Sequence, residues 1–238
     1  MHTHPSPLVR KQLSRIVLLL RKISDMAVEH QLQQPVLFAG MAVYFHVHTE
    51  HFRTRCERLS NDIDFLVAEQ DARAWADLLA LDYQDGKSDY FQGIKLKGTV
   101  DAVEVDMLAA ASSRFPGYDP DYVFPLDISC AQAATTVDGD LQIGLMAPAE
   151  LAVFKLLLGR GKSAGKYDFE DAAALIVDTG LQPEELFAVF ARGITFSDVH
   201  RQFVRNRLQR CAGHSPNLFG RYLPDFLAAI EVWGRRKG

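Results

Sequence analysis

The sequence predicts an α+β fold, in which a mixed β-sheet flanked by helices is followed by a C-terminal helical domain. Short apolar or alternating segments of the kind that form strands are confined to residues 36–146. Helical patterns of apolar residues lie before and between those segments. Beyond them the chain carries helical patterns alone, separated by Gly, Pro and Asn. We therefore expect a sheet domain over residues 1–146 and a helical domain over residues 147–238.

The first helices and strands follow from the spacing of apolar residues. This spacing predicts helices at residues 8–30, 41–50 and 71–81. Val36-Leu37-Phe38 is an apolar run that fits a short buried strand, and Gly40 follows it at the turn into the second helix. From Asp62 to Val67, acidic and apolar residues alternate before the segment becomes fully apolar, which is typical of a strand that emerges from the core.

Turn-forming residues divide the rest of the chain. The turns are expected at Asp85-Gly86, Lys97-Gly98 and Asp138-Gly139-Asp140. Antiparallel strands are then expected at residues 91–96, 100–108, 132–137 and 141–146. The helical domain is expected to contain helices at residues 148–158, 166–179, 183–191, 197–209 and 223–235.

The composition argues against membrane-spanning and disulfide-stabilised classes. No apolar run approaches the roughly 20 residues that cross a bilayer, and residues 1–10 lack the pattern of a secretory signal. The three cysteines, Cys56, Cys130 and Cys211, lack the spacing of a disulfide framework or a zinc site. We expect a cytoplasmic protein with no membrane partner and with idle thiols.

Two aspartates, Asp62 and Asp64, are the strongest functional signal. Residues two apart on a strand face the same side, so the two carboxylates project together while Ile63 points into the core. Like charges about 4 Å apart repel by roughly 4 kcal/mol at an effective dielectric of 20, and a divalent cation would relieve that repulsion. A lone pair of this kind is more often two surface residues at a strand end.

A later strand offers a third carboxylate. Glu104-Val105-Asp106 repeats the alternation, and a neighbouring strand would bring Asp106 beside Asp62 and Asp64. Glu104 lies on the same face as Asp106 and is the alternative ligand. Carboxylate oxygens suit Mg²⁺ or Mn²⁺, and the N-terminus of the helix at Gly40 offers backbone N–H groups to phosphate. The sequence therefore predicts a divalent-metal site beside a turn that can bind phosphate.

Five short segments, taken in order, resemble a known superfamily. They are Phe38-Ala39-Gly40-Met41-Ala42, Arg58-Leu59-Ser60-Asn61-Asp62-Ile63-Asp64-Phe65, Glu104-Val105-Asp106, Pro148-Ala149-Glu150-Leu151 with Lys155, and Lys166-Tyr167-Asp168-Phe169-Glu170-Asp171. Their order resembles that in the nucleotidyltransferase superfamily with the polymerase-β-like fold, and within it the AbiEii-like bacterial toxin group. The resemblance in the sheet domain covers about residues 30–110.

The resemblance implies an activity. A nucleoside monophosphate would pass from an NTP, such as ATP, to a hydroxyl acceptor on RNA, a protein or a small molecule. The site residues that it implies are Asp62, Asp64 and Asp106 for metal and catalysis, and Gly40, Lys155 and Lys166 for phosphate contacts. Ser60 either caps a turn or touches phosphate. A toxin role with an antitoxin partner would follow from the subgroup.

One departure from the family pattern supports a second hypothesis. The family usually has another glycine and a Ser or Thr in the phosphate turn, where this chain has Ala39 and Met41. A charge-assisted hydrogen bond lost there is worth about 1.5–3 kcal/mol. The alternative is therefore a catalytically degenerate member that acts as a nucleotide-binding or regulatory module.

Charged residues of the helical domain are open to two interpretations. From Arg201 onward, eight Lys or Arg stand against two acids. Arg205, Arg207 and Arg210 either contact an RNA acceptor or are simply solvated. Asp168 and Asp171 lie one helical turn apart beside Lys166, where local salt bridges are expected.

Overall fold

A computed structural model describes residues 7–47, 62–87, 91–114, 123–131, 135–138, 141–161, 166–193 and 198–233. The chain divides into two compact units. The first, here called the sheet unit, comprises residues 1–113 and 125–147, and the second, the helical unit, comprises residues 114–124 and 148–238. Within the described ranges, none of the helices has both the length and the apolar character needed to cross a bilayer.

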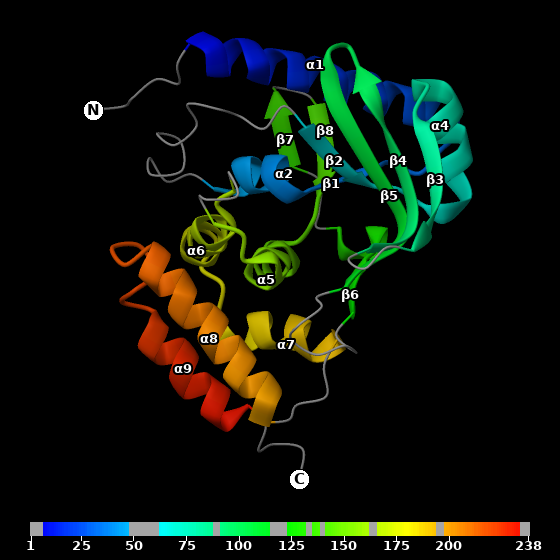
Figure 1. Cartoon of the computed structure of the whole chain (residues 1–238). Helices are drawn as coiled ribbons and strands as arrows, with labels where there is room; N and C mark the ends of the chain where they lie inside the picture. The colour runs from blue at the N-terminus through cyan, green and yellow to red at the C-terminus, as the bar shows by residue number, and fades with distance from the viewer. Residues whose placement is uncertain are drawn as a thin grey trace. The chain divides into compact units, whose positions relative to one another are not determined.

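The sheet unit is built on a mixed sheet (Figure 1). The strands of this sheet are β1 (Val36–Phe38), β2 (Asp62–Leu66), β3 (Asp82–Lys87), β4 (Phe91–Val100), β5 (Val103–Arg114), β6 (Val123–Leu126), β7 (Thr135–Asp138) and β8 (Leu141–Leu145). The boundary between the two units falls inside β6. Their order is β3-β4-β5-β2-β1-β8-β7, with β6 paired to β5. β2 runs parallel to β5, and β1 runs parallel to β8, while β1–β2, β3–β4, β4–β5 and β7–β8 are antiparallel.

Among the described residues of the sheet unit, three helices pack against these strands. They are α1 (Pro7–Glu29), α2 (Ala39–His46) and α4 (Ala72–Leu79). α1 contacts β8, α2 contacts β1 and β2, and α4 contacts β3 and β4. Ile16 of α1 and Trp75 of α4 are fully buried, because the apolar stripe of each amphipathic helix faces inward. A short 3-10 turn, Glu69–Asp71, precedes α4, and another, Ile128–Cys130, follows β6.

Two predicted turns are wrong. Asp85 and Gly86 lie inside β3, where they pair with Ile94 and Gly93 of β4. Lys97 and Gly98 lie inside β4, where Lys97 pairs with Asp82 of β3 and Gly98 pairs with Val105 of β5. The chain instead turns at Asp101-Ala102, whose φ angles of 50° and 63° are both positive. A two-residue hairpin turn with two positive φ angles matches the right-handed twist of its strands. Lys22 of α1 contacts this turn, with its Nζ 2.9 Å from Oδ2 of Asp101.

The helical unit contains α5 (Pro148–Leu158), α6 (Asp168–Asp178), α7 (Pro183–Gly193), α8 (Asp198–His214) and α9 (Leu223–Val232). α5 lies against α6, α7 and α8, and α9 lies against α7 and α8. Its aromatic core is centred on Phe187, which stacks on Trp233 with ring centroids 4.7 Å apart. The predicted fold class, a mixed sheet with flanking helices followed by a helical region, is therefore confirmed.

A glycine in β4 yields a prediction about the sheet. Gly93 lies at a register shift in the β4–β5 ladder with a φ of 131°, and a Cβ there would stand 2.7 Å from the Cα of Ala111. Gly93→Ala is therefore expected to lower the free energy of unfolding by about 2–4 kcal/mol. Urea denaturation measures this change.

Gly86 is the matched control for Gly93. It is the ladder partner of Gly93 on β3, and a Cβ at Gly86 would meet nothing within 4 Å. Gly86→Ala is expected to change the free energy of unfolding by no more than about 0.5 kcal/mol. Equal effects of the two substitutions would contradict the assigned bulge.

Candidate functional site

The parallel pairing of β2 and β5 brings two predicted site residues together. In this register Asp64 is the direct partner of Asp106, and Asp62 is the partner of Glu104. Neighbouring strands lie about 4.8 Å apart, so four carboxylates share one small area. Asp106, and not its alternative Glu104, is the carboxylate beside Asp64.

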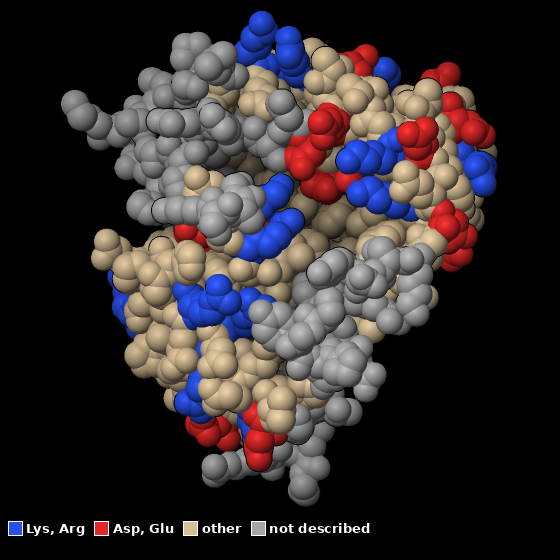
Figure 2. Space-filling view, viewed as in Figure 1, with Lys and Arg blue, Asp and Glu red and all other residues tan. Residues whose placement is uncertain are grey.

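The four acids occupy one face because the residues between them fill the core. Ile63 and Val105 are fully buried, whereas Asp62, Asp64 and Asp106 are half-buried. The alternation of a strand therefore turns every carboxylate toward the opposite, open face. Figure 2 shows acidic side chains gathered where β2 and β5 lie in Figure 1, with basic side chains immediately beside them. We call this the acidic face.

Lysines of β4 adjoin the acidic face. Nζ of Lys95 lies 2.8 Å from Oδ2 of Asp106, and Lys97 is the direct ladder partner of Asp106. The sequence analysis did not identify either lysine. The alternation of Lys95 and Lys97 with the buried Ile94 and Leu96 is the signal that would have revealed them.

The predicted phosphate turn adjoins the same face. β1 is antiparallel to β2 with Phe38 opposite Asp64, and α2 begins at the next residue and packs against β2. Gly40, the predicted phosphate ligand, is the second residue of that helix. Its neighbour Ala39 adopts a φ of 56°, in the left-handed region that glycine occupies without strain. Ser60, the other predicted phosphate contact on this side, lies outside the described residues.

The chemistry of the acidic face suits a divalent cation. Oδ1 of Asp106 is buried and has no hydrogen-bond partner among the described residues, and a buried unsatisfied oxygen is costly. Carboxylate oxygens are the ligands that Mg²⁺ prefers. The side chains are not closed into a metal cage, since the described residues contain no group of three or more His, Cys, Asp or Glu that could hold a metal ion.

Lys155, the predicted triphosphate contact, is the centre of a buried ion network in the helical unit. Its Nζ lies 3.2 Å from Oδ1 of Asp168 and 2.9 Å from Oδ2 of Asp171. Arg160 completes the network, with its Nε 2.7 Å from Oδ2 of Asp168. The expected salt bridges of the two aspartates are therefore present, but their partners are Lys155 and Arg160. Lys166, the expected partner, has an exposed side chain.

The network shifts the pKa values of its members. Burial alone would lower the pKa of Lys155, but the charges of Asp171 and Asp168 outweigh burial and raise that pKa. Burial would raise the pKa of Asp168, but hydrogen bonds from Arg160 and the charge of Lys155 lower it. Since the pKa of Asp168 falls on folding, its contribution to stability is present above a pH of about 4 and is lost as the pH drops further.

Cys211 of α8 carries a buried thiol that contacts the backbone carbonyl of Phe169. Burial, reinforced by the charge of Glu170, raises the pKa of the Cys211 thiol well above its ordinary range. The thiol therefore stays protonated near neutral pH, and a protonated thiol is a poor nucleophile.

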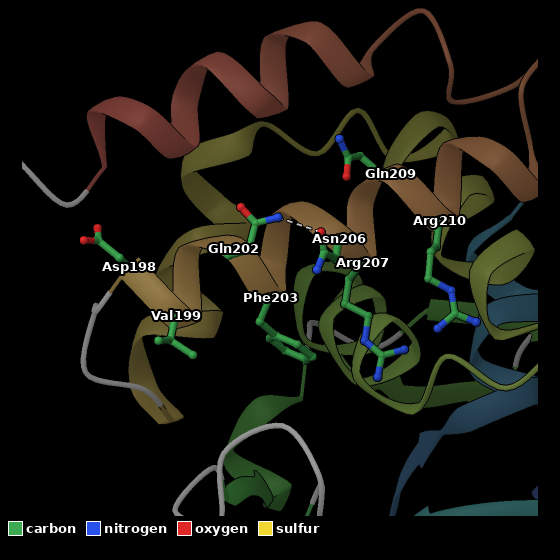
Figure 3. A pocket seen from close by; sticks show the side chains of 8 residues that line it. All are labelled: Asp198, Val199, Gln202, Phe203, Asn206, Arg207, Gln209 and Arg210. Carbon is green, nitrogen blue, oxygen red and sulfur yellow. Dashed lines mark hydrogen bonds between the residues drawn. The ribbon is translucent and has the colours of Figure 1, made fainter.

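The arginines of α8, predicted either to contact RNA or to be solvated, differ from one another. Arg205 pairs with Glu231, while Arg207 is 2% exposed and lies over the rings of Phe203 and Phe169. Arg210 is exposed and stacks on Phe169. An open groove of about 980 Å³ runs along α8, and Figure 3 shows Arg207 and Arg210 toward one end of the side chains that line it. Internal contacts thus engage all three arginines.

Comparisons with known proteins give distant likenesses of structure. No family model and no curated protein matches the sequence. A proposed nucleotidyltransferase from Thermotoga maritima is similar with a TM-score of 0.47 and 16% identity, over 69% of this chain and 94% of that chain. The antibiotic-resistance factor ANT(2'')-Ia is similar with a TM-score of 0.48 and 16% identity, over 75% of this chain and 91% of that chain.

A third likeness extends over more of the chain. An antigenic nucleotidyltransferase-like protein from Paracoccidioides brasiliensis gives a TM-score of 0.44 and 11% identity, over 89% of this chain and 93% of that chain. At TM-scores below 0.5, any assignment of function depends on the residues of this chain.

The left-handed conformation of Ala39 yields a prediction about the phosphate turn. Ala39→Gly removes the strain of a Cβ at a φ of 56° and is expected to raise the free energy of unfolding by about 0.5–1 kcal/mol. Ala42→Gly, at a buried position inside α2, is the control and is expected to lower it by about 1 kcal/mol. Urea denaturation of both variants distinguishes strain at Ala39 from a general effect of glycine in α2.

The buried ion network yields a second prediction. Lys155→Met leaves Asp171 buried without its cation, so the free energy of unfolding is expected to fall by about 3–5 kcal/mol. The exposed Lys166 is the control, and Lys166→Met is expected to change that free energy by no more than about 0.5 kcal/mol. Thermal and urea denaturation measure both changes, and a neutral effect of Lys155→Met would contradict the structural role of the network.

Proposed function

We propose that this chain is a metal-dependent nucleotidyltransferase that moves a nucleoside monophosphate from an NTP to a hydroxyl acceptor. The acceptor oxygen forms a bond to the α-phosphorus while the bond between that phosphorus and the bridging oxygen breaks. Pyrophosphate leaves with the bonding electron pair. The register of Asp64 with Asp106, on one face with Asp62, is the observation that carries this proposal.

Residues of the acidic face supply the chemistry in this proposal. Asp62, Asp64 and Asp106 would hold Mg²⁺ or Mn²⁺, which would supply positive charge against the negative charge that develops on the transferring phosphoryl group. Asp106 accepts the proton of the attacking hydroxyl. Gly40, in the first turn of α2, presents its backbone N–H to the nucleotide phosphate. Two features of this chain support these roles: the unsatisfied Oδ1 of Asp106 and the packing of α2 against β2.

A second candidate function keeps nucleotide binding without transfer. Two observations favour it. Ala39 lacks the freedom of the glycine that the phosphate turn of the resembled family usually has, and Lys95 already neutralises part of Asp106. In this case the protein would be a nucleotide-responsive regulatory module. The toxin role and the antitoxin partner expected from the sequence stay predictions.

An assay with NTPs labelled at the α-phosphate tests the first candidate. The purified chain is incubated with Mg²⁺, each labelled NTP and cell extract, and transfer of label to a larger product is expected. Ribonuclease and protease digestion then identify the acceptor as RNA, protein or a small molecule. Asp64→Asn is expected to reduce the rate by about a hundredfold or more.

Asp85 supplies the control for this assay. Asp85 is an exposed carboxylate on β3, and Asp85→Asn removes the same charge while leaving the acidic face intact. Its rate is expected to stay within about twofold of the original. Calorimetry with a nonhydrolysable NTP and Mg²⁺ separates the two candidates. Binding without transfer favours the regulatory module, and the absence of both binding and transfer contradicts both candidates.

A further inference from the structure

The ion pair between Lys95 and Asp106 occupies a carboxylate that the proposed function needs for a metal ion. Nζ of Lys95 lies 2.8 Å from Oδ2 of Asp106, and the two side chains are 32% and 21% exposed. The other oxygen, Oδ1, is buried and accepts no hydrogen bond from the described residues. One oxygen of Asp106 is therefore neutralised by an ammonium group, and the other is withdrawn from water without compensation.

The position of Lys95 on β4 allows its side chain to move away from Asp106. The direct ladder partner of Asp106 is Lys97, and Lys95 is opposite Leu108, so Lys95 reaches Asp106 along a diagonal. A lysine side chain is a flexible four-carbon stem that ends in a compact charge. Rotation of that stem separates the pair without any change in the β4–β5 ladder.

We propose that Lys95 is the resident counter-ion of Asp106 in the metal-free protein and that a divalent cation must displace it. This inference rests on the proposed metal site of Asp62, Asp64 and Asp106. After displacement, the ammonium group remains at the acidic face, where it donates hydrogen bonds to phosphate oxygens of the NTP. Lys95 thereby moves from a carboxylate to a phosphate and contacts the nucleotide directly.

This exchange couples the binding of metal and nucleotide. Metal that enters alone places its charge beside the displaced Lys95 ammonium, and like charges at short range repel. The phosphates of an NTP relieve this repulsion because they pair with both cations. Metal binding is therefore weak alone and stronger with nucleotide, and linkage requires nucleotide binding to be strengthened by metal to the same degree.

Calorimetric titration of the full chain with Mn²⁺ tests the coupling, with and without a nonhydrolysable ATP analogue. Lys95→Met is expected to raise the affinity of the nucleotide-free protein for Mn²⁺ by about tenfold. It is also expected to reduce the increase in Mn²⁺ affinity that the ATP analogue causes. Lys97→Met removes an equal charge from the same strand and face. Because it leaves the ion pair intact, its effect is expected to be about twofold.

Three further variants make the outcome decisive. Lys95→Arg keeps the charge and is expected to bind Mn²⁺ as the original chain does, while Lys95→Gln is a second neutral variant that should match Lys95→Met. The proposed role of Lys95 would be overturned if Lys95→Met and Lys95→Gln both bind Mn²⁺ with the affinity of the original chain. It would also be overturned if their Mn²⁺ affinity is no higher than that of Lys97→Met. Equal Mn²⁺ binding by the original chain and Asp64→Asn would instead overturn the proposed metal site. Circular dichroism verifies that each variant is folded.

Discussion

The parallel pairing of β2 with β5 is the constraint on which the acidic face depends. It holds Asp64 beside Asp106 at a spacing set by backbone hydrogen bonds, so the two carboxylates cannot separate without breaking the ladder. Their repulsion is an energetic burden that the sheet sustains because Ile63 and Val105 are buried beneath it. Two carboxylates held together in this way are stabilised by a nearby cation. The ammonium group of Lys95 supplies part of that positive charge.

Backbone strain at the start of α2 is a second unfavourable contribution to stability, and it lies next to the acidic face. Ala39 adopts a left-handed conformation even though alanine has a Cβ, because β1 must end at Phe38 and the chain must turn at once into a helix against β2. Strained backbone at a candidate site is consistent with function, since folding alone would favour its removal. The backbone strain at Ala39 and the repulsion between Asp64 and Asp106 therefore lie at the same end of the β1–β2 pair.

In the helical unit, the buried charges are paired with charges of opposite sign. Lys155 and Asp168 are almost completely buried, and each charge has a partner of opposite sign within hydrogen-bond distance. A buried charge is tolerated only with such compensation, and so these residues fix the packing of α5 on α6. Lys155 of the resembled motif thus forms a contact between two helices, and its phosphate contact stays a prediction.

The sequence by itself determined the fold class, the position of most helices and strands, and the shared face of Asp62 and Asp64, because apolar periodicity is a local signal. It misplaced the turn between β4 and β5, since Gly98 is a stronger local turn signal than Ala102, and the pairing of Gly98 with Val105 of β5 keeps it inside a strand. Register is likewise non-local. Only the tertiary structure decided that Asp106 lies beside Asp64, that Lys95 reaches it, and that Lys155 is buried, because each of these facts depends on which segments distant in sequence become neighbours.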